Sequence, residues 1–193
     1  YNNFMMPGSK DLLTTTSFHM EVSTVTVLET AKKMIDYSHG NLHDINHFMK
    51  VYAYAKMIAD GEQLDPDTQK LVEMTALVHD IACPLCRVKY GNTNGKNQEK
   101  ESAALIAEFF KDSNLPQDFT DRISFLVSHH HTLDQIDGID YQIIIEADYL
   151  VNADESHFSG HNIKNMYDKI FKTETGKFLL RSMYQNCLEN ETL

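Results

Sequence analysis

Two aspartates and a histidine stand out in this sequence because each adjoins or interrupts an apolar helical stretch. His79 and Asp80 directly follow the apolar residues 76–78, and Asp148 lies within the apolar run 143–151. An unpaired buried carboxylate costs several kcal/mol, so such a side chain should meet a cation, a metal ion or hydrogen-bond donors. These residue types therefore point to a buried ionic or metal-binding site.

A second group of histidines lies nearer the N-terminus. His39, His43 and His47 are spaced by four residues, which would place them on one side of a continuous helix. Gly40 and Asn41 interrupt that helix and separate His39 from the other two. His47 begins the apolar stripe of the following segment, so it is the member best placed to reach a buried site.

We therefore consider a metal site built by His47, His79, Asp80 and Asp148. Two imidazoles and two carboxylates suit Mn, Fe, Co, Ni or Zn, with Mg as a further option, and argue against an ion that prefers thiolates. Water in the open coordination positions would become a nucleophile near neutral pH. The hypothesis requires that separate helices bring these four side chains together.

Each of these residues also has an ordinary interpretation when taken alone. A histidine at a helix start is more often exposed or capping than metal-binding, and a His-Asp pair arises by chance in many chains. His43-Asp44 is a second such pair, and the run 129–131 of three histidines could be exposed. Only the joint order and surroundings of the residues favour the functional interpretation.

Composition and charge narrow the classes of function. The 193 residues suit one domain, which we expect at 23–193 after a flexible arm at 1–22. With 28 acidic and 17 basic residues the net charge is −11, which disfavours nucleic acid and membrane surfaces as partners. Three cysteines and the lack of a long apolar run or signal peptide favour a cytoplasmic protein. Nothing in the sequence selects an oligomeric state.

The elements expected to position these residues are helices. Apolar residues recur at helical spacing through nearly the whole chain, and the run of three isoleucines at 143–145 is assigned to a helix because no partner strand is present. The expected fold class is all-α, with a long loop at 83–100 marked by Pro, Gly and Asn. The expected helices cover approximately residues 26–38, 44–60, 65–78, 98–111, 116–131, 141–151, 162–171 and 176–189.

The order of these motifs resembles the HD-domain metal-dependent phosphohydrolases. The motifs are His43-Asp44-x-x-His47-x-x-x-Val51, Ala76-Leu77-Val78-His79-Asp80-Ile81 and Glu146-Ala147-Asp148-Tyr149-Leu150. The resemblance spans residues 27–155 and is greatest to small stand-alone bacterial HD proteins, whose first motif also reads His-Asp-x-x-His. It implies an all-α, HD-domain-like helical bundle with a metal site in its core.

The resemblance also implies roles for individual residues. His47, His79, Asp80 and Asp148 would hold the principal ion, and Asp80 would also take part in catalysis. His130 would bind a second ion or the substrate phosphate and act in catalysis, with His129 as the alternative substrate-binding histidine. His43 and Asp44 would support the ligands from behind.

Two departures from the family pattern modify these roles. Asn97-Gln98 stands where two-metal relatives have a histidine, so one ion is favoured over two. Ala82-Cys83 stands where many relatives have Gly-Lys, so the phosphate-binding cation must come from elsewhere; Arg87, Lys89 and Lys100 are expected to bind substrate, and Lys96 is a further candidate. The Gly-Tyr-Pro extension of cyclic-dinucleotide-cleaving relatives is absent.

The favoured function is metal-dependent hydrolysis of a nucleotide or another small phosphate ester, as a phosphomonoesterase or phosphodiesterase. An alternative is a non-catalytic HD-like module that binds a ligand or regulates a partner. Thiol redox chemistry at Cys83-Pro-Leu-Cys86 has the right spacing but lacks a surrounding βαβ pattern. Oxygenase chemistry, found in certain di-iron HD proteins, is disfavoured by the missing upstream histidine.

Overall fold

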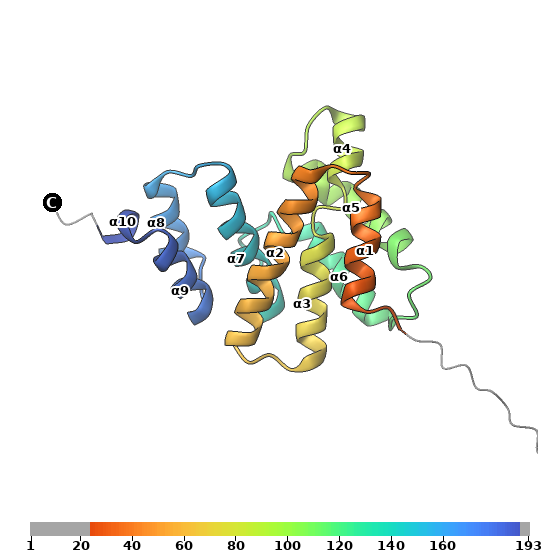
Figure 1. Cartoon of the computed structure of the whole chain (residues 1–193), viewed down its shortest axis with the longest axis horizontal. Helices are drawn as coiled ribbons and strands as arrows, with labels where there is room; N and C mark the ends of the chain where they lie inside the picture. Colours follow the sequence, from red (N-terminus) through yellow and green to blue (C-terminus); the bar gives the residue numbers. More distant parts are fainter. Residues whose placement is uncertain (1–23, 190–193) are drawn as a thin grey trace, which may run out of the picture.

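The computed structural model describes residues 24–189, and within this range every regular element is a helix (Figure 1). The arm expected at residues 1–22 lies outside the described residues. None of the helices formed by residues 24–189 is both long and apolar enough to cross a bilayer. The helices are α1 Val27–Tyr37, α2 Leu42–Gly61, α3 Pro66–Val78, α4 Cys83–Tyr90, α5 Gly95–Phe110, α6 Gln117–His129, α7 Ile139–Glu155, α8 Gly160–Lys169, α9 Glu174–Met183 and α10 Gln185–Glu189.

Helices α2, α3 and α7 pack against one another in the middle of the molecule (Figure 1). Helix α7 is buried along most of its length, including all three isoleucines of 143–145. A helix that is apolar on all sides is stable only inside a protein, where neighbouring helices cover it. The β-branched run is therefore helical, as expected, because α2 and α3 cover it and no strand within residues 24–189 could pair with it.

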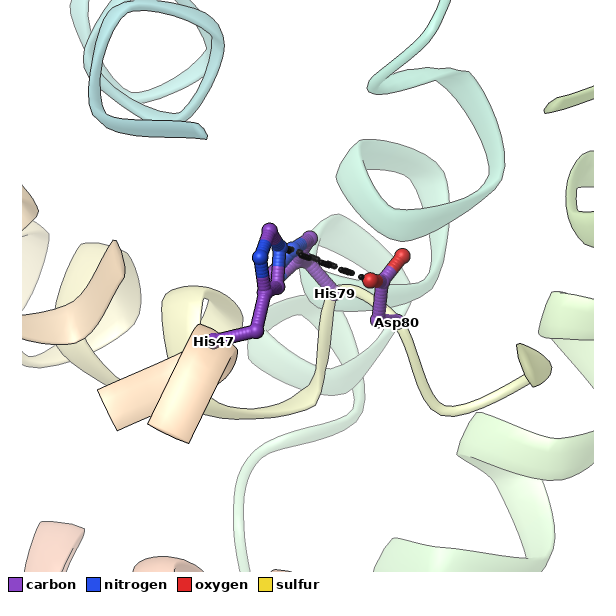
Figure 2. A group of neighbouring side chains, drawn as sticks. All are labelled: His47, His79 and Asp80. Carbon is purple, nitrogen blue, oxygen red and sulfur yellow. Dashed lines mark hydrogen bonds and ion pairs between the residues drawn. The ribbon is translucent and has the colours of Figure 1, made fainter. Parts of the chain in front are cut away.

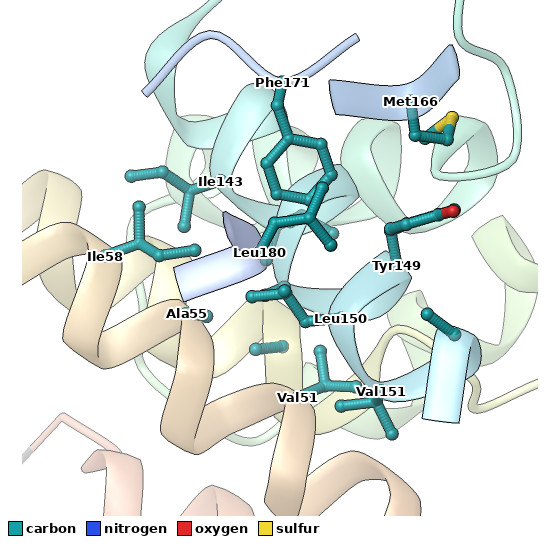
Figure 3. Close-up of a cluster of buried hydrophobic side chains, with 14 of the residues drawn as sticks. Val51, Ala55, Ile58, Ile143, Tyr149, Leu150, Val151, Met166, Phe171 and Leu180 are labelled. Carbon is teal, nitrogen blue, oxygen red and sulfur yellow. The ribbon is translucent and has the colours of Figure 1, made fainter. Parts of the chain in front are cut away.

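Two apolar clusters fill the interior. One joins α2 and α7 to the C-terminal helices through side chains such as Ile58, Leu150 and Phe171 (Figure 3). The other joins α1, α3, α5 and α6 through side chains such as Met74 and Ile123. Burial of large apolar side chains contributes about 1.5–3 kcal/mol each, so these clusters hold the helices that carry the polar site residues in fixed positions.

A buried carboxylate fixes α7 to the segment between α8 and α9. Glu146 accepts hydrogen bonds from the backbone N–H of Lys172 (2.6 Å) and Thr173 (3.0 Å), and from the side chains of Gln142 (2.7 Å) and Thr173. Burial raises its pKa, while these hydrogen bonds to the carboxylate oppose the rise. Glu146 lies in the same motif as Asp148, but its carboxylate is bound by these hydrogen-bond donors and has a structural role.

The prediction of a long loop at residues 83–100 is wrong. Residues 83–90 form α4, and α5 begins at Gly95, so only four residues connect the two helices. Pro84 lies in the first turn of α4, where a missing N–H costs nothing, and Gly91 ends the helix with φ of +68°. Asn94 caps α5 by accepting a hydrogen bond from the N–H of Asn97. Residues usually found in loops here mark the two ends of a tight helix–helix connection.

The remaining helices form where the sequence predicts them, with shifted ends. The final helix expected at 176–189 is divided into α9 and α10 by a break at Tyr184. Helix α2 begins earlier than expected because Asn41 caps it and accepts a hydrogen bond from the N–H of Asp44. This start places His47 in the second turn of α2, on its buried side.

Candidate metal centre

Four side chains from three parts of the fold converge at one point. His47 comes from α2, His79 and Asp80 from the end of α3, and Asp148 from α7. Figure 2 shows the first three directed toward one another. The Nε2 atoms of His47 and His79 lie 3.2 Å apart. Asp80 Oδ2 lies 3.5 and 3.7 Å from these nitrogens, and Asp148 Oδ1 lies 3.3 and 3.5 Å from them.

Hydrogen bonds on the far side of each imidazole set its orientation. His79 Nδ1 donates to the carbonyl oxygen of Ala76 at 2.8 Å, and His47 Nδ1 donates to Glu155 at 2.9 Å. Glu155 is held in turn by Lys50 Nζ at 2.9 Å. A proton on Nδ1 leaves the Nε2 lone pair free, which is the arrangement usual for metal-binding histidines. Both Nε2 atoms face the two carboxylate oxygens.

The spacing of the four donor atoms fits a shared ion. Ligand atoms that each lie about 2.1 Å from a metal stand roughly 3.0–3.4 Å from one another, depending on the coordination geometry. The separation of the two imidazole nitrogens and their distances to the carboxylate oxygens are 3.2–3.7 Å, at or slightly above this range. His47, His79 and Asp148 are buried while Asp80 is partly exposed, so the cluster has one side open to solvent. The residues present could therefore hold a divalent metal ion.

The electrostatics of the cluster favour a positive charge at its centre. Burial acts to raise the pKa of Asp148, but hydrogen bonds and charge from His47 and His79 hold it well below its ordinary value. Burial acts to lower the pKa of His47, yet Asp148 and Asp80 raise it to about 9. Two carboxylates thus attract a cation to this position, and a divalent ion would replace the proton that His47 otherwise binds.

His130 extends the cluster on one side. Its Nδ1 donates to the carbonyl oxygen of Val127 at 2.8 Å, and its buried Nε2 lies 3.6 Å from Asp80 Oδ1. Among residues 24–189 this Nε2 has no hydrogen-bond partner. A buried polar atom without a partner calls for a ligand, an ion or a water. His130 is therefore directed at the centre from the C-terminal end of α6.

His131 also reaches this region, although sequence reasoning did not single it out. It forms a second possible metal-binding group with Asp80 and His130, and its ring lies 3.9 Å from that of His130. Loss of hydration and the neighbouring His130 lower its pKa to about 4, so it is neutral at neutral pH. The run of three histidines at 129–131 was visible in the sequence. However, the run lies at a helix end, where the sequence does not determine the direction of each side chain.

A cavity of about 260 Å³ opens onto the centre and holds several further polar groups. Arg87 lines it and forms two hydrogen bonds to Asp44, at 2.6 and 2.7 Å. Gln98 lines it as well; its amide donates to the carbonyl oxygen of Thr93, and its buried Oε1 has no partner among the described residues. His43 is part of the same wall. The cavity thus combines three of the candidate metal ligands, His47, Asp80 and Asp148, with one guanidinium group.

Three of the residues expected to bind substrate lie elsewhere. Lys89 pairs with Glu101 at 2.8 Å, and Lys100 lies over the ring of Tyr90. His129 stacks on a phenylalanine ring and bonds to the backbone of its own helix. None of the three lines the cavity, so they would contact only a substrate that extends beyond it.

The fold and the geometry of this centre define a class: an all-helical protein in which helices supply His, His-Asp and Asp to one point that could hold a metal ion. The HD domain family model matches residues 44–154, which contain all four of these residues. The chain therefore belongs to the HD domain family.

Solved structures of low sequence identity share this fold. A predicted HD superfamily hydrolase from an uncultured Thermotogales bacterium is 21% identical, with a TM-score of 0.59 over 84% of this chain and 86% of that one. YpgQ of Bacillus subtilis is 17% identical, with a TM-score of 0.59 over 85% of this chain and 91% of that one. Among curated proteins none matches this sequence.

Proposed function

We propose that this protein is a metal-dependent phosphohydrolase that acts on a nucleotide or another small phosphate ester. The observation that carries the proposal is the convergence at a polar cavity of two imidazole nitrogens, of His47 and His79, that lie 3.2 Å apart and each within 3.3–3.7 Å of an oxygen of Asp80 and of Asp148. Membership of the HD family and the similarity to a protein described as an HD superfamily hydrolase support the same activity.

These four residues would hold one divalent ion, with Mn, Fe, Co, Ni or Zn suited to the donor set and Mg as a further option. Such an ion supplies Lewis acidity, which lowers the pKa of water and polarises a phosphoryl oxygen. One ion is favoured over two because Asn97-Gln98 stands where two-metal relatives have a histidine, and Gln98, which lines the cavity, offers only a neutral amide oxygen, a weaker ligand. Asp80, the most exposed of the four, borders both the ligand set and His130.

The chain's own residues account for binding and proton transfer. Arg87 supplies positive charge at the cavity wall for the substrate phosphate, and Asp44 orients it through two hydrogen bonds. His130 keeps its Nε2 available, so it can hold a proton that passes to the leaving oxygen. The burial of His47, His79 and Asp148 limits contact of the centre with bulk water, which strengthens these interactions.

The expected setting is the cytoplasm, with a small phosphorylated molecule as the partner. The net charge of −11 repels nucleic acid and anionic membrane surfaces at long range. A small anion can still reach the centre, because a bound divalent ion and Arg87 supply local positive charge.

Elemental analysis of the purified protein, followed by a screen of phosphorylated metabolites with each candidate metal, tests this function. We expect close to one transition metal ion per chain and release of inorganic phosphate or a phosphorylated product from at least one ester. Stoichiometric metal without turnover of any ester would instead favour the alternative, a non-catalytic HD-like ligand-binding or regulatory module.

Replacing Arg87 is expected to weaken substrate binding without removing metal. In Arg87→Ala the phosphate loses a charge-assisted hydrogen bond, so KM should rise by about tenfold while kcat changes little. Lys89→Ala is the matched control, because Lys89 pairs with Glu101 outside the cavity. Steady-state kinetics and metal content measured on both variants check this, and an equal effect of the two would contradict the role of Arg87.

Replacing both cysteines of the Cys83–Cys86 pair is expected to change little. Both side chains are buried, and burial raises the pKa of each thiol, so neither forms the thiolate that redox chemistry requires. The double variant Cys83→Ser with Cys86→Ser should keep hydrolytic activity within about threefold of the parent, given the small packing change. Loss of activity with full metal content would revive the thiol hypothesis.

A further inference from the structure

The turn that follows α6 carries His130 and His131 to the region of the metal centre. Helix α6 ends at His129, and the N–H of Thr132 donates to the carbonyl oxygen of His129 at 2.6 Å. We refer to residues 129–132 as the histidine turn. Carbonyl groups at the end of a helix lack partners within the helix, so they depend on donors from elsewhere in the fold.

Tyr141 supplies such a donor. Its side chain is buried in the first turn of α7, and its Oη donates to the carbonyl oxygens of Thr132, at 2.7 Å, and of His129. A phenol has a single proton to donate, so the two carbonyl groups share it. These carbonyl groups stand at the two ends of the histidine turn. One hydroxyl group therefore holds the backbone on both sides of His130 and His131.

Contacts other than the hydroxyl hold Tyr141 against α6. Its ring packs edge to face on Phe125, with centroids 6.1 Å apart and planes at 88°. The neighbouring Asp140 accepts two hydrogen bonds from Arg122 of α6, at 2.7 and 2.8 Å. Tyr141→Phe keeps the ring contact and leaves this ion pair in place. The hydroxyl can therefore be removed while α6 and α7 stay packed together.

Helix α5 supports the histidine turn through side chains. Thr132 Oγ1 donates to Glu99 at 2.8 Å. The His131 ring lies so close to Gly95 that a Cβ on this glycine would stand 2.7 Å from ring atoms. Both contacts are made by side chains of the turn, whereas the Tyr141 hydroxyl is bonded to its backbone. The hydroxyl is thus the contact that acts on the backbone that carries His130.

The position of His130 has narrow limits if it is to transfer a proton. Its Nδ1 donates to the carbonyl oxygen of Val127 at 2.8 Å, and its buried Nε2 lies 3.6 Å from Asp80 Oδ1. Proton transfer needs heavy atoms about 2.6–3.2 Å apart. A misplacement of about 1 Å can cost about 10²-fold in rate. A small movement of the backbone at residue 130 would therefore take Nε2 away from the reacting atoms.

We propose that Tyr141 is a positioning residue whose hydroxyl fixes the histidine turn and so holds His130 Nε2 at the metal centre. This inference rests on the proposed phosphohydrolase function, in which His130 holds the proton for the leaving oxygen. Tyr141 is not part of the cavity wall, so it acts through His130 and does not touch the substrate.

Tyr141→Phe tests the proposal because it removes only the hydroxyl. We expect kcat to fall about tenfold, with KM and metal content unchanged, since the loss is confined to the placement of His130. Tyr52→Phe is the matched control: it removes a hydroxyl that lies 3.4 Å from a carboxylate oxygen of Glu73, outside the cavity, and should keep the kcat of the parent. A parent-like kcat in Tyr141→Phe, or an equal fall in Tyr52→Phe, would overturn the proposal.

The double variant of Tyr141→Phe with His130→Ala distinguishes positioning of His130 from a general loss of stability. Once His130 is removed, the hydroxyl has no catalytic group to position. The double variant should therefore have the same kcat as His130→Ala alone, which is the non-additivity expected of two coupled residues. A fall in kcat by the same factor in the parent and in His130→Ala would overturn the proposal.

A measurement without turnover keeps this inference separate from the proposed function. In metal-free protein with isotope-labelled histidines, the ring resonances of His130 are identified by their absence from His130→Ala. Tyr141→Phe should shift or broaden them, and Tyr52→Phe should leave them unchanged. If the metal-loaded protein hydrolyses no ester, the phosphohydrolase proposal fails, and these spectra still decide whether the Tyr141 hydroxyl positions His130. Unchanged His130 resonances in Tyr141→Phe would overturn the inference.

Discussion

Asp80→Asn is expected to reduce hydrolysis by more than about 10³-fold and to remove most of the bound metal. Asp80 Oδ2 lies 3.5 and 3.7 Å from the two imidazole nitrogens, and its Oδ1 lies 3.6 Å from His130. The substitution keeps the shape of the side chain but removes the negative charge that a divalent ion requires. A bound ion stabilises charge in the transition state by several kcal/mol, and each 1.36 kcal/mol corresponds to a factor of ten in rate.

Two measurements separate loss of metal from loss of fold in this variant. A ligand that binds only the native state raises thermal stability, so the parent protein should melt at a higher temperature with metal than with chelator. Asp80→Asn should lose this difference while keeping its helical circular dichroism. Asp60→Asn is the matched control, since Asp60 lies on the exposed side of α2. A parent-like rate and metal-dependent melting shift in Asp80→Asn would overturn the assignment of the centre.

Three of the four candidate metal ligands could be picked out from the sequence because they conflict with their surroundings. Asp148 is a charged residue inside an apolar helix, and His79-Asp80 ends a buried one, so each needs a partner that the local sequence does not supply. The helical fold was readable for a related reason, since the apolar residues recur at one period through most of the chain. A charged residue in an apolar segment and a helical repeat of apolar residues are both local properties, so both can be recognised from the sequence alone.

The rest of the centre depends on contacts between distant helices, which the sequence does not display. Glu155 contacts His47 only because the last turn of α7 lies beside the second turn of α2. Gln98 enters the cavity because α4 and α5 are joined by a short connection, where Pro, Gly and Asn suggest a long loop. His131 lines the cavity because of the path that the backbone takes after α6 ends at His129. The sequence does not show this path, so it does not show which of the three histidines reaches the cavity.

His130→Ala is expected to lower kcat by roughly 10²–10³-fold while the metal content stays unchanged. A positioned acid–base group or a donor at a developing negative charge contributes an effect of this size. His129→Ala is the matched control: it makes the same change one residue earlier, at a ring that stacks on Phe125 and lies outside the cavity.

The comparison of these two histidines separates a catalytic role from a structural one. Both residues end α6 and bond through Nδ1 to a carbonyl oxygen of their own helix, so loss of helix stability should affect both variants similarly. Only His130 has an Nε2 directed at Asp80, at 3.6 Å. Equal kcat values in the two variants would contradict the proton-transfer role of His130. A fall from two ions to one per chain in His130→Ala would instead make His130 a ligand of a second ion and overturn the one-ion proposal.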